Sequence, residues 1–175
     1  TKVKVIQVCK THKKTKKKAT NKKTAKKNTQ KETTTKVTEK NAQKETVGSE
    51  EQQYIEKIVQ LVNKERKSAG LNAVQLDETL TKAAMTRAKE TNISFSHTRP
   101  DGTSFSTVLS QYKISYRGAG ENIAWGQQSP DEVMRGWMNS SGHRANILNK
   151  NFKKIGVGYY KVENGRKYWS QLFIY

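Results

Sequence analysis

The chain is short of several features that would narrow its class. Cys9 is its single cysteine, so no disulfide can form within the chain. An exported protein of a Gram-positive bacterium commonly does without disulfides, so their absence does not settle the compartment. No apolar run approaches the ~20 residues that a membrane-spanning helix needs. We expect Cys9 to be an exposed thiol without a role in lipidation or catalysis.

Two common signatures of hydrolases are missing. The chain has neither an H-E-x-x-H helix pair nor a G-x-S-x-G nucleophile turn. Its one thiol, Cys9, lies in a polar N-terminal region, which disfavours cysteine–histidine chemistry. Ser140 and Ser141 closely precede His143, but adjacent serines at this place are expected to cap a helix. The sequence therefore favours a protein that is not an enzyme, with metal-assisted hydrolysis as the alternative.

Charge divides the 175 residues into two parts. Residues 1–47 hold sixteen Lys and three Glu, a balance of +13, whereas residues 48–175 hold eighteen Lys or Arg and twelve Asp or Glu, a balance of +6. The first part is mainly Lys, Thr, Asn, Gln and Glu, and such a segment buries too little apolar surface to offset its ordering entropy. We predict a disordered basic linker over 1–47, with only a brief strand-like alternation near its start, and one domain over 48–175.

The Lys/Thr-rich tail points to polyanionic partners. We expect it to contact an anionic cell-wall polymer such as teichoic acid, or to serve only as a spacer. A nucleic-acid arm would bind phosphate without sequence selectivity. Residues 1–47 contain no Phe, Tyr or Trp to stack on bases and no Arg, so nucleic acid is the less favoured partner.

The first half of the domain carries helical patterns. Apolar residues recur at helical spacing over 51–69, and Gly70 is placed to end that helix in a left-handed cap. Asp77 can cap a second helix that fades near Asn92. A short third helix is predicted within 103–112, where apolar residues again follow the helical period.

The second half combines strands with one more helix. Ser129 is placed to cap a helix, with Glu132 completing a capping box. Residues 122–125 and the alternating stretch 155–159 predict strands, and Asn164-Gly165 predicts a type I′ hairpin turn. Residues 168–175 are bulky on both faces, as in a central strand covered by helices on both sides. The order of elements predicts an α+β fold, a three-layer α-β-α sandwich with a central antiparallel sheet.

Two histidines and a glutamate stand out as candidate site residues. His97, Glu121 and His143 lie in three separate segments beside Gly, Ser or Pro, where loops can turn side chains toward a shared cleft. Two imidazoles and a carboxylate suit a divalent metal such as zinc, or proton transfer as catalytic acid and base. Alternatively, Glu121 orients one imidazole or forms a salt bridge that holds the loops.

Five short motifs follow one another over roughly residues 50–175. They are His97-Thr98-Arg99-Pro100-Asp101-Gly102, Gly120-Glu121-Asn122-Ile123-Ala124, Gly136-Trp137-Met138-Asn139-Ser140, Gly142-His143-Arg144-Ala145-Asn146-Ile147-Leu148 and Tyr168-Trp169-Ser170-Gln171-Leu172-Phe173. In this order they resemble the CAP superfamily (cysteine-rich secretory, antigen 5, pathogenesis-related-1), in its bacterial SCP-like extracellular branch. The lack of disulfides fits the bacterial branch.

The resemblance implies an α-β-α sandwich with a central cleft. In many members the cleft carries two histidines and two acidic residues and can bind zinc. His97, Glu121 and His143 occupy three of those four places. The fourth acid would stand shortly after Trp137, but none of the next four residues is a carboxylate. Gln171 matches a family position on the strand that floors the cleft.

Together these features predict an exported bacterial CAP-domain protein that works as a surface or secreted binding module. Its ligand would be a protein, a lipid or cell-wall material, and its cleft can take a divalent metal. The alternatives are a zinc-assisted hydrolase of peptide or cell-wall material and a polyanion or nucleic-acid binder acting through the tail. The expected location is outside the cell or on the wall of a Gram-positive-like bacterium. No signal peptide is visible at Thr1, so we expect a mature or trimmed chain.

Overall fold

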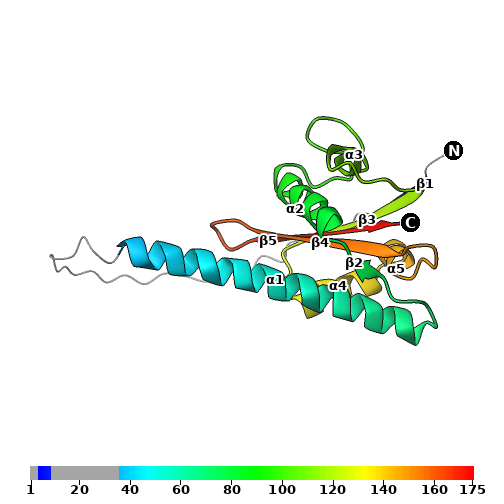
Figure 1. Ribbon diagram of the computed structural model, residues 1–175, viewed down its shortest axis with the longest axis horizontal. Coiled ribbons are helices and arrows are strands. Elements are labelled where there is room, and N and C mark those ends of the chain that lie inside the picture. Colours follow the sequence, from blue (N-terminus) through cyan, green and yellow to red (C-terminus); the bar gives the residue numbers. More distant parts are fainter. Residues whose placement is uncertain (1–3, 9–35) are drawn as a thin grey trace, which may run out of the picture.

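Figure 1 shows a computed structural model of the protein, in which the structure describes residues 4–8 and 36–175. In chain order the elements are β1 (Lys4–Val8), α1 (Lys36–Ser68), β2 (Gln75–Leu76), α2 (Glu78–Ile93), α3 (Thr107–Gln111), β3 (Gly118–Trp125), α4 (Pro130–Met138), α5 (Ser141–Ile147), β4 (Lys154–Lys161) and β5 (Lys167–Ile174).

The strands form one mixed sheet in the order β1-β3-β5-β4-β2. The three central strands are antiparallel, as predicted, because β5 pairs with β3 on one side and with β4 on the other. The short edge strands β1 and β2 pair in parallel with β3 and β4. Only β4 and β5 are joined by a hairpin, whereas the edge strands connect through helices, which permits parallel pairing.

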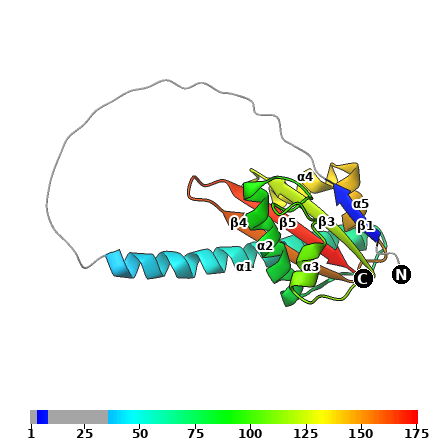
Figure 2. The ribbon, with the colours of Figure 1, turned by 90° about the horizontal axis from the view of Figure 1, so that it is seen from above.

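Helices cover both faces of the sheet, which confirms the three-layer sandwich. In Figures 1 and 2, α2 and α3 lie on one face, and α1, α4 and α5 lie on the other. Successive residues of β5 point to opposite faces. Leu172 accordingly packs with Leu80 and Leu109 in the α2 layer, while Phe173 packs with Val62 and Trp137 in the α1 layer.

Glycines on β4 allow α2 to lie unusually close to the sheet. A Cβ atom at Gly156 would overlap the backbone of Leu80, and one at Gly158 would overlap the backbone of Ala84. The alternation of glycine with bulky residues over 155–159 thus has a packing reason. The glycines face the helix backbone, and the residues between them fill the opposite layer.

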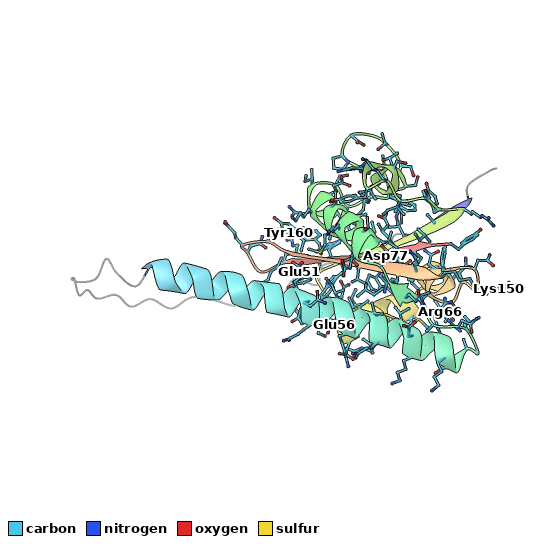
Figure 3. The ribbon with its side chains drawn as sticks, viewed as in Figure 1. Glu51, Glu56, Arg66, Asp77, Lys150 and Tyr160 are labelled. Carbon is cyan, nitrogen blue, oxygen red and sulfur yellow. The ribbon has the colours of Figure 1, made fainter. Side chains whose placement is uncertain are left out.

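The end of α1 and the starts of α2 and α4 follow the sequence predictions with one difference. Gly70 is left-handed, with φ of 70°, and the Asp77 side chain accepts from Leu80 N at the start of α2 (Figure 3). The Ser129 hydroxyl caps α4 by accepting from Glu132 N at 3.2 Å. The Glu132 carboxylate, however, accepts from the N–H of the residue before the cap, residue 128, at 2.8 Å. The predicted reciprocal bond is therefore shifted by one residue.

The hairpin turn between β4 and β5 differs from the prediction. A type I′ turn needs positive φ at both central residues. Gly165 has φ of 80°, but Lys113 is the only non-glycine residue in the described ranges with positive φ, so Asn164 does not fulfil this condition. The loop spans residues 162–166, and Val162 N donates to the carbonyl of residue 166 at 3.0 Å. In this longer loop a single left-handed glycine reverses the chain.

The N-terminal region contains more regular structure than the sequence indicated. Within the predicted linker 1–47, Lys4–Val8 forms β1, and α1 begins at Lys36 instead of at residue 51. Lys, Glu, Gln and Ala are good helix formers, so the helix can extend through this polar stretch. The disorder predicted over residues 9–35 lies outside the described residues, and the boundary at residue 48 stays a prediction. No helix in the described ranges is both long and apolar enough to cross a membrane.

Candidate functional site

Glu121 is the centre of a buried ionic cluster. It lies on β3 and its side chain is not exposed at all. Arg87, from the buried face of α2, donates through Nε to Glu121 Oε2 at 2.7 Å. The Nδ1 atom of His97 lies 2.6 Å from Glu121 Oε1. The structure thus brings His97 and Glu121 together, and adds an arginine that the sequence analysis did not single out.

The cluster continues from Arg87 toward the surface. Arg87 Nη1 donates to Glu90 at 2.6 Å, and Nη2 donates to the Ser96 carbonyl at 2.7 Å. Arg99 then donates to the other oxygen of Glu90 at 2.6 Å. Burial raises the pKa of Glu90, but hydrogen bonds and positive charge from Arg99 and Arg87 outweigh it and hold that pKa below its usual range. His97, Glu121, Arg87, Glu90 and Arg99 are called the ionic cluster below.

Arg87 keeps its charge despite its burial. Loss of water lowers the pKa of its guanidinium, but hydrogen bonds and negative charge from Glu121 and Glu90 outweigh this and raise the pKa. One signal in the sequence could have pointed to it. Arg87 stands on the same helix face as Ala83, Ala84 and Ala88, so it interrupts an otherwise apolar stripe.

The backbone of His143 takes part in a second group of polar contacts. It lies on α5 and is buried. Asn122, the residue after Glu121, donates through Nδ2 to the His143 carbonyl at 3.1 Å. Asn146 Nδ2 donates to Asn122 Oδ1 at 2.9 Å. Neighbouring side chains on a strand point to opposite faces, so Glu121 is directed to the α2 layer and Asn122 to the α5 layer.

Gln171 joins the same polar group on the α5 side. It lies on β5, fully buried, and its Oε1 accepts from Asn122 Nδ2 at 3.0 Å. Its amide nitrogen lies 4.0 Å from the sulfur of Met134 on α4. Gln171 therefore connects the sheet to the helices around His143, and the structure does not place it on the wall of the cavity described next.

A small cavity lies between β3 and the helices α4 and α5. Its volume is ≈ 50 Å³, and its lining residues are Ile123, Ala124, Gln127, Val133, Gly136, Trp137, Ser140 and His143. Ser140 precedes α5 at the capping position, but its hydroxyl makes no capping hydrogen bond. This corrects the expectation that Ser140 acts as a helix cap. We call this space the α4 cavity.

The described residues do not fit a zinc site. Across residues 4–8 and 36–175, no group of three or more His, Cys, Asp or Glu side chains is arranged to hold a metal ion. Both oxygens of Glu121 already accept hydrogen bonds, and the guanidinium of Arg87 beside them repels a divalent cation. His97 Nε2 is buried and has no hydrogen-bond partner within the described part of the chain.

Comparison with known proteins places this fold and these motifs in one family. The profile "CAP: Cysteine-rich secretory protein family" matches residues 59–173. The chain belongs to this family, as the five motifs predicted. The match covers α2, β3, α4, α5 and the β4–β5 hairpin except for the last residue of β5, so it includes the whole ionic cluster and the α4 cavity.

Relatives with this domain occur in several bacteria. The chain is 48% identical to YkwD of Bacillus subtilis (strain 168) over 123 residues, which are 69% of this chain and 47% of YkwD. An extracellular SCP-domain protein of Bacillus anthracis str. Ames is 32% identical with a TM-score of 0.66, over 71% of this chain and 41% of that one. An outer surface protein of Borrelia burgdorferi is 26% identical with a TM-score of 0.61, over 66% of this chain and 87% of that one. The chain spans less than half the length of the two Bacillus proteins.

One distant structure with this fold was solved with zinc. NaASP2 with Zn²⁺ is 15% identical, with a TM-score of 0.51, over 67% of this chain and 77% of that one. At that identity the likeness shows a shared fold alone.

Proposed function

We propose that this protein is an extracellular or surface binding module of a bacterium, and that it binds its ligand without a metal. The observation that carries the proposal is the state of Glu121, whose two oxygens accept from Arg87 and His97 in a fully buried position. In this arrangement Glu121 holds α2 and the His97 loop against the sheet. The names of the Bacillus anthracis and Borrelia burgdorferi relatives support an extracellular or surface location.

Zinc binding at His97, Glu121 and His143 would have to break this arrangement. A zinc ion at Glu121 would displace Arg87 or His97. Displacing Arg87 would separate a buried ion pair and leave Arg87 with Glu90 alone as its counter-charge, which is destabilising. The four residues after Trp137 supply no further carboxylate to compensate for this loss.

Calorimetric titration of the full chain with zinc tests the proposal. The controls are His97→Ala and His143→Ala, which remove the two imidazoles. We expect no saturable binding above that of the two variants. One-to-one binding that is lost in both variants would overturn the proposal, because it would make the three residues a metal site.

A hydrolase is the second candidate function, and one observation favours it. His97 is held through Nδ1 by Glu121, and its Nε2 has no hydrogen-bond partner in the described part of the chain. A carboxylate-oriented imidazole of this kind can act as a general base. The zinc-assisted form of this hypothesis requires turnover of peptide or cell-wall material that chelation abolishes and zinc restores. Turnover that persists with a chelator and is lost in His97→Gln would instead identify metal-free catalysis.

The basic N-terminal region is proposed to contact an anionic cell-wall polymer. This proposal is supported by the net charge of +13 over residues 1–47. Co-sedimentation of the full chain with walls containing teichoic acid should fall steeply as salt is added. Removing residues 1–35 should abolish most of this binding. Equal salt-dependent binding to DNA would favour a general polyanion binder.

A further inference from the structure

The outer edge of β4 is only partly covered by another strand. In the sheet, β4 lies between β5 and the two-residue strand β2, which pairs only with Lys154 and Ile155. Just after β2, Asp77 N donates to the Ile155 carbonyl at 3.0 Å. Across residues 4–8 and 36–175, no strand pairs with this edge from Gly156 to Lys161. Such an edge presents backbone N–H and C=O groups that a further strand can bind.

The β4–β5 ladder shows which backbone groups face this edge. Val162 N donates to the carbonyl of the last hairpin-loop residue at 3.0 Å, so these two residues form a hydrogen-bonded pair. Such pairs alternate along an antiparallel ladder, so Tyr160 bonds to β5, whereas Tyr159 and Lys161 direct their N–H and C=O groups outward. Ile155, which accepts on the β2 side, follows the same alternation.

A groove lies beside the open edge, between α1 on one face of the sheet and α2 on the other. Its volume is ≈ 340 Å³, within the range of about 300–1,000 Å³ that is typical of ligand sites. Figure 3 labels Glu51 on its α1 side and Tyr160 on its β4 side. We call it the β4 groove, and its lining residues are Glu50, Glu51, Met85, Lys89, Tyr159, Tyr160 and Lys161. None of them belongs to the ionic cluster.

The outward N–H of Tyr159 has only a weak partner. It donates to the thioether sulfur of Met85 at 3.2 Å, and sulfur is a weak acceptor. Met85 is partly exposed, and its side chain is unbranched and flexible, so it can move aside without a shift of α2. Lys161 is exposed, and within the described part of the chain no neighbouring strand accepts from its outward N–H. Both groups are therefore suited to the carbonyls of an added strand.

The charges of the β4 groove favour an acidic partner. Glu50 is paired with Lys167 at 3.7 Å. Among the described residues, Glu51, Lys89 and Lys161 take part in no ion pair, which leaves two positive charges and one negative charge. Burial raises the pKa of Glu51, and the positive charge of Lys89 offsets only part of this effect. Carboxylates on a partner would thus be attracted to the two lysines.

We propose that the β4 groove binds an acidic peptide in an extended conformation, which adds to the outer edge of β4 as a further strand. One peptide carbonyl replaces the Met85 sulfur as the acceptor for Tyr159 N–H, and another accepts from Lys161 N–H. Acidic side chains of the peptide contact Lys89 and Lys161. In such strand addition, backbone hydrogen bonds give affinity and side chains give selectivity. The groove is separate from the ionic cluster, so peptide binding and the absence of zinc binding can fail independently.

The test is amide hydrogen exchange of the full chain, followed by NMR with and without a pentapeptide. The probe is acetylated and amidated, and threonine alternates with glutamate in it. At saturating peptide we expect exchange of the Lys161 N–H to slow by about tenfold or more, because this group gains an acceptor. The Tyr160 N–H already bonds to β5, so it is the internal reference. Unchanged exchange at both Tyr159 and Lys161 would overturn the proposal.

Two further peptides test what the β4 groove recognises. The N-methylated form of the probe keeps the charges, but its methyl groups prevent close strand pairing, so it should not slow the exchange. A peptide with lysine in place of glutamate keeps the backbone and should bind several-fold more weakly. Equal protection by the N-methylated form would overturn the strand addition. Equal binding of the lysine peptide would overturn the acidic partner.

Lys161 provides a matched pair of variants. Lys161→Pro removes the outward N–H, whereas the hydrogen bonds to β5 use the residues on either side of it. Lys161→Ala removes the same charge and keeps the N–H. We expect Lys161→Pro to bind the probe about tenfold more weakly than Lys161→Ala. Equal affinities of the two variants, both folded by circular dichroism, would contradict the proposal. If Lys161→Pro does not fold, the comparison of the probe with its N-methylated form decides.

Discussion

Arg87 and Glu121 form a two-point ion pair in which neither side chain is exposed. Nε lies 2.7 Å from Oε2, and Nη2 lies 3.3 Å from Oε1. The pair connects α2 to β3 across 34 residues of sequence. A planar guanidinium suits this geometry, and an ammonium does not.

Removing one partner of this pair should be costly. Arg87→Met should lower the free energy of unfolding by about 3–5 kcal/mol, because Glu121 is left buried without its counter-charge. The measurement is urea unfolding followed by circular dichroism. Replacing both residues, as Arg87→Met with Glu121→Leu, should recover part of the loss. A substitution at the exposed Arg117 is the control. If Arg87→Met is as stable as that control variant, this account is wrong.

Acid should weaken the protein partly through Glu90. Its pKa is lower in the folded protein than the ordinary value of 4.5, because Arg99 and Arg87 outweigh the effect of burial. Its stabilising contribution is therefore complete above pH 4.5 and is lost as the pH falls through the folded pKa. Glu90→Gln should flatten the loss of stability below this pH in unfolding measurements. Glu163→Gln, in the exposed hairpin loop, should leave the loss of stability at low pH unchanged.

Glycine substitutions should separate close packing from open space. In Gly158→Ala the new Cβ overlaps the backbone of Ala84, which cannot yield as a flexible side chain does. We expect a loss of about 1–3 kcal/mol or more, measured by thermal unfolding. Gly136→Ala meets no atom and should stabilise α4 by up to about 1 kcal/mol. A similar effect of both variants would mean that α2 does not depend on the glycines of β4.

Arg66 should be as important for stability as a core residue. It is 1% exposed, and burial lowers the pKa of its guanidinium. It projects from the end of α1 (Figure 3). Its nitrogens donate to the backbone carbonyls of Asn72, Ile147, Asn149 and Phe152 at 2.8, 2.8, 2.9 and 3.3 Å.

Arg66→Met would leave these carbonyls without their donor. We expect a loss of about 2–4 kcal/mol in the free energy of unfolding, since each unsatisfied buried group costs about 1–3 kcal/mol. The neighbouring exposed residue gives the control, and Lys67→Met should change stability by less than about 0.5 kcal/mol. If both variants lose the same amount, the carbonyl contacts of Arg66 do not stabilise the fold.

Local signals in the sequence predicted the elements well. The cap at Asp77, the left-handed Gly70 and the alternation over 155–159 each depend on neighbouring residues alone, so a single sequence is enough to find them. The prediction of a type I′ turn at Asn164-Gly165 was wrong, because the type of turn depends on where the two flanking strands stop pairing. That position is set by the whole sheet.

The contacts of the candidate site were harder to predict. His97 and Glu121 were found through their motifs, but the partner that decides their chemistry, Arg87, lies on a helix and meets Glu121 only after folding. Ser140 was expected to cap a helix. Its hydroxyl is buried and makes no capping hydrogen bond, and this depends on how β3, α4 and α5 pack together, which a single sequence does not show.

The ionic cluster also affects how the protein responds to salt. Apart from His97, it contains two cations and two anions, so these four residues contribute nothing to the net charge of +19. The surplus positive charge lies on other side chains. At physiological ionic strength, dissolved ions screen the interactions between exposed charges that are more than about 8 Å apart, but they screen buried pairs much less. Added salt should therefore weaken long-range attraction to anions while the ion pair of Arg87 and Glu121 stays intact.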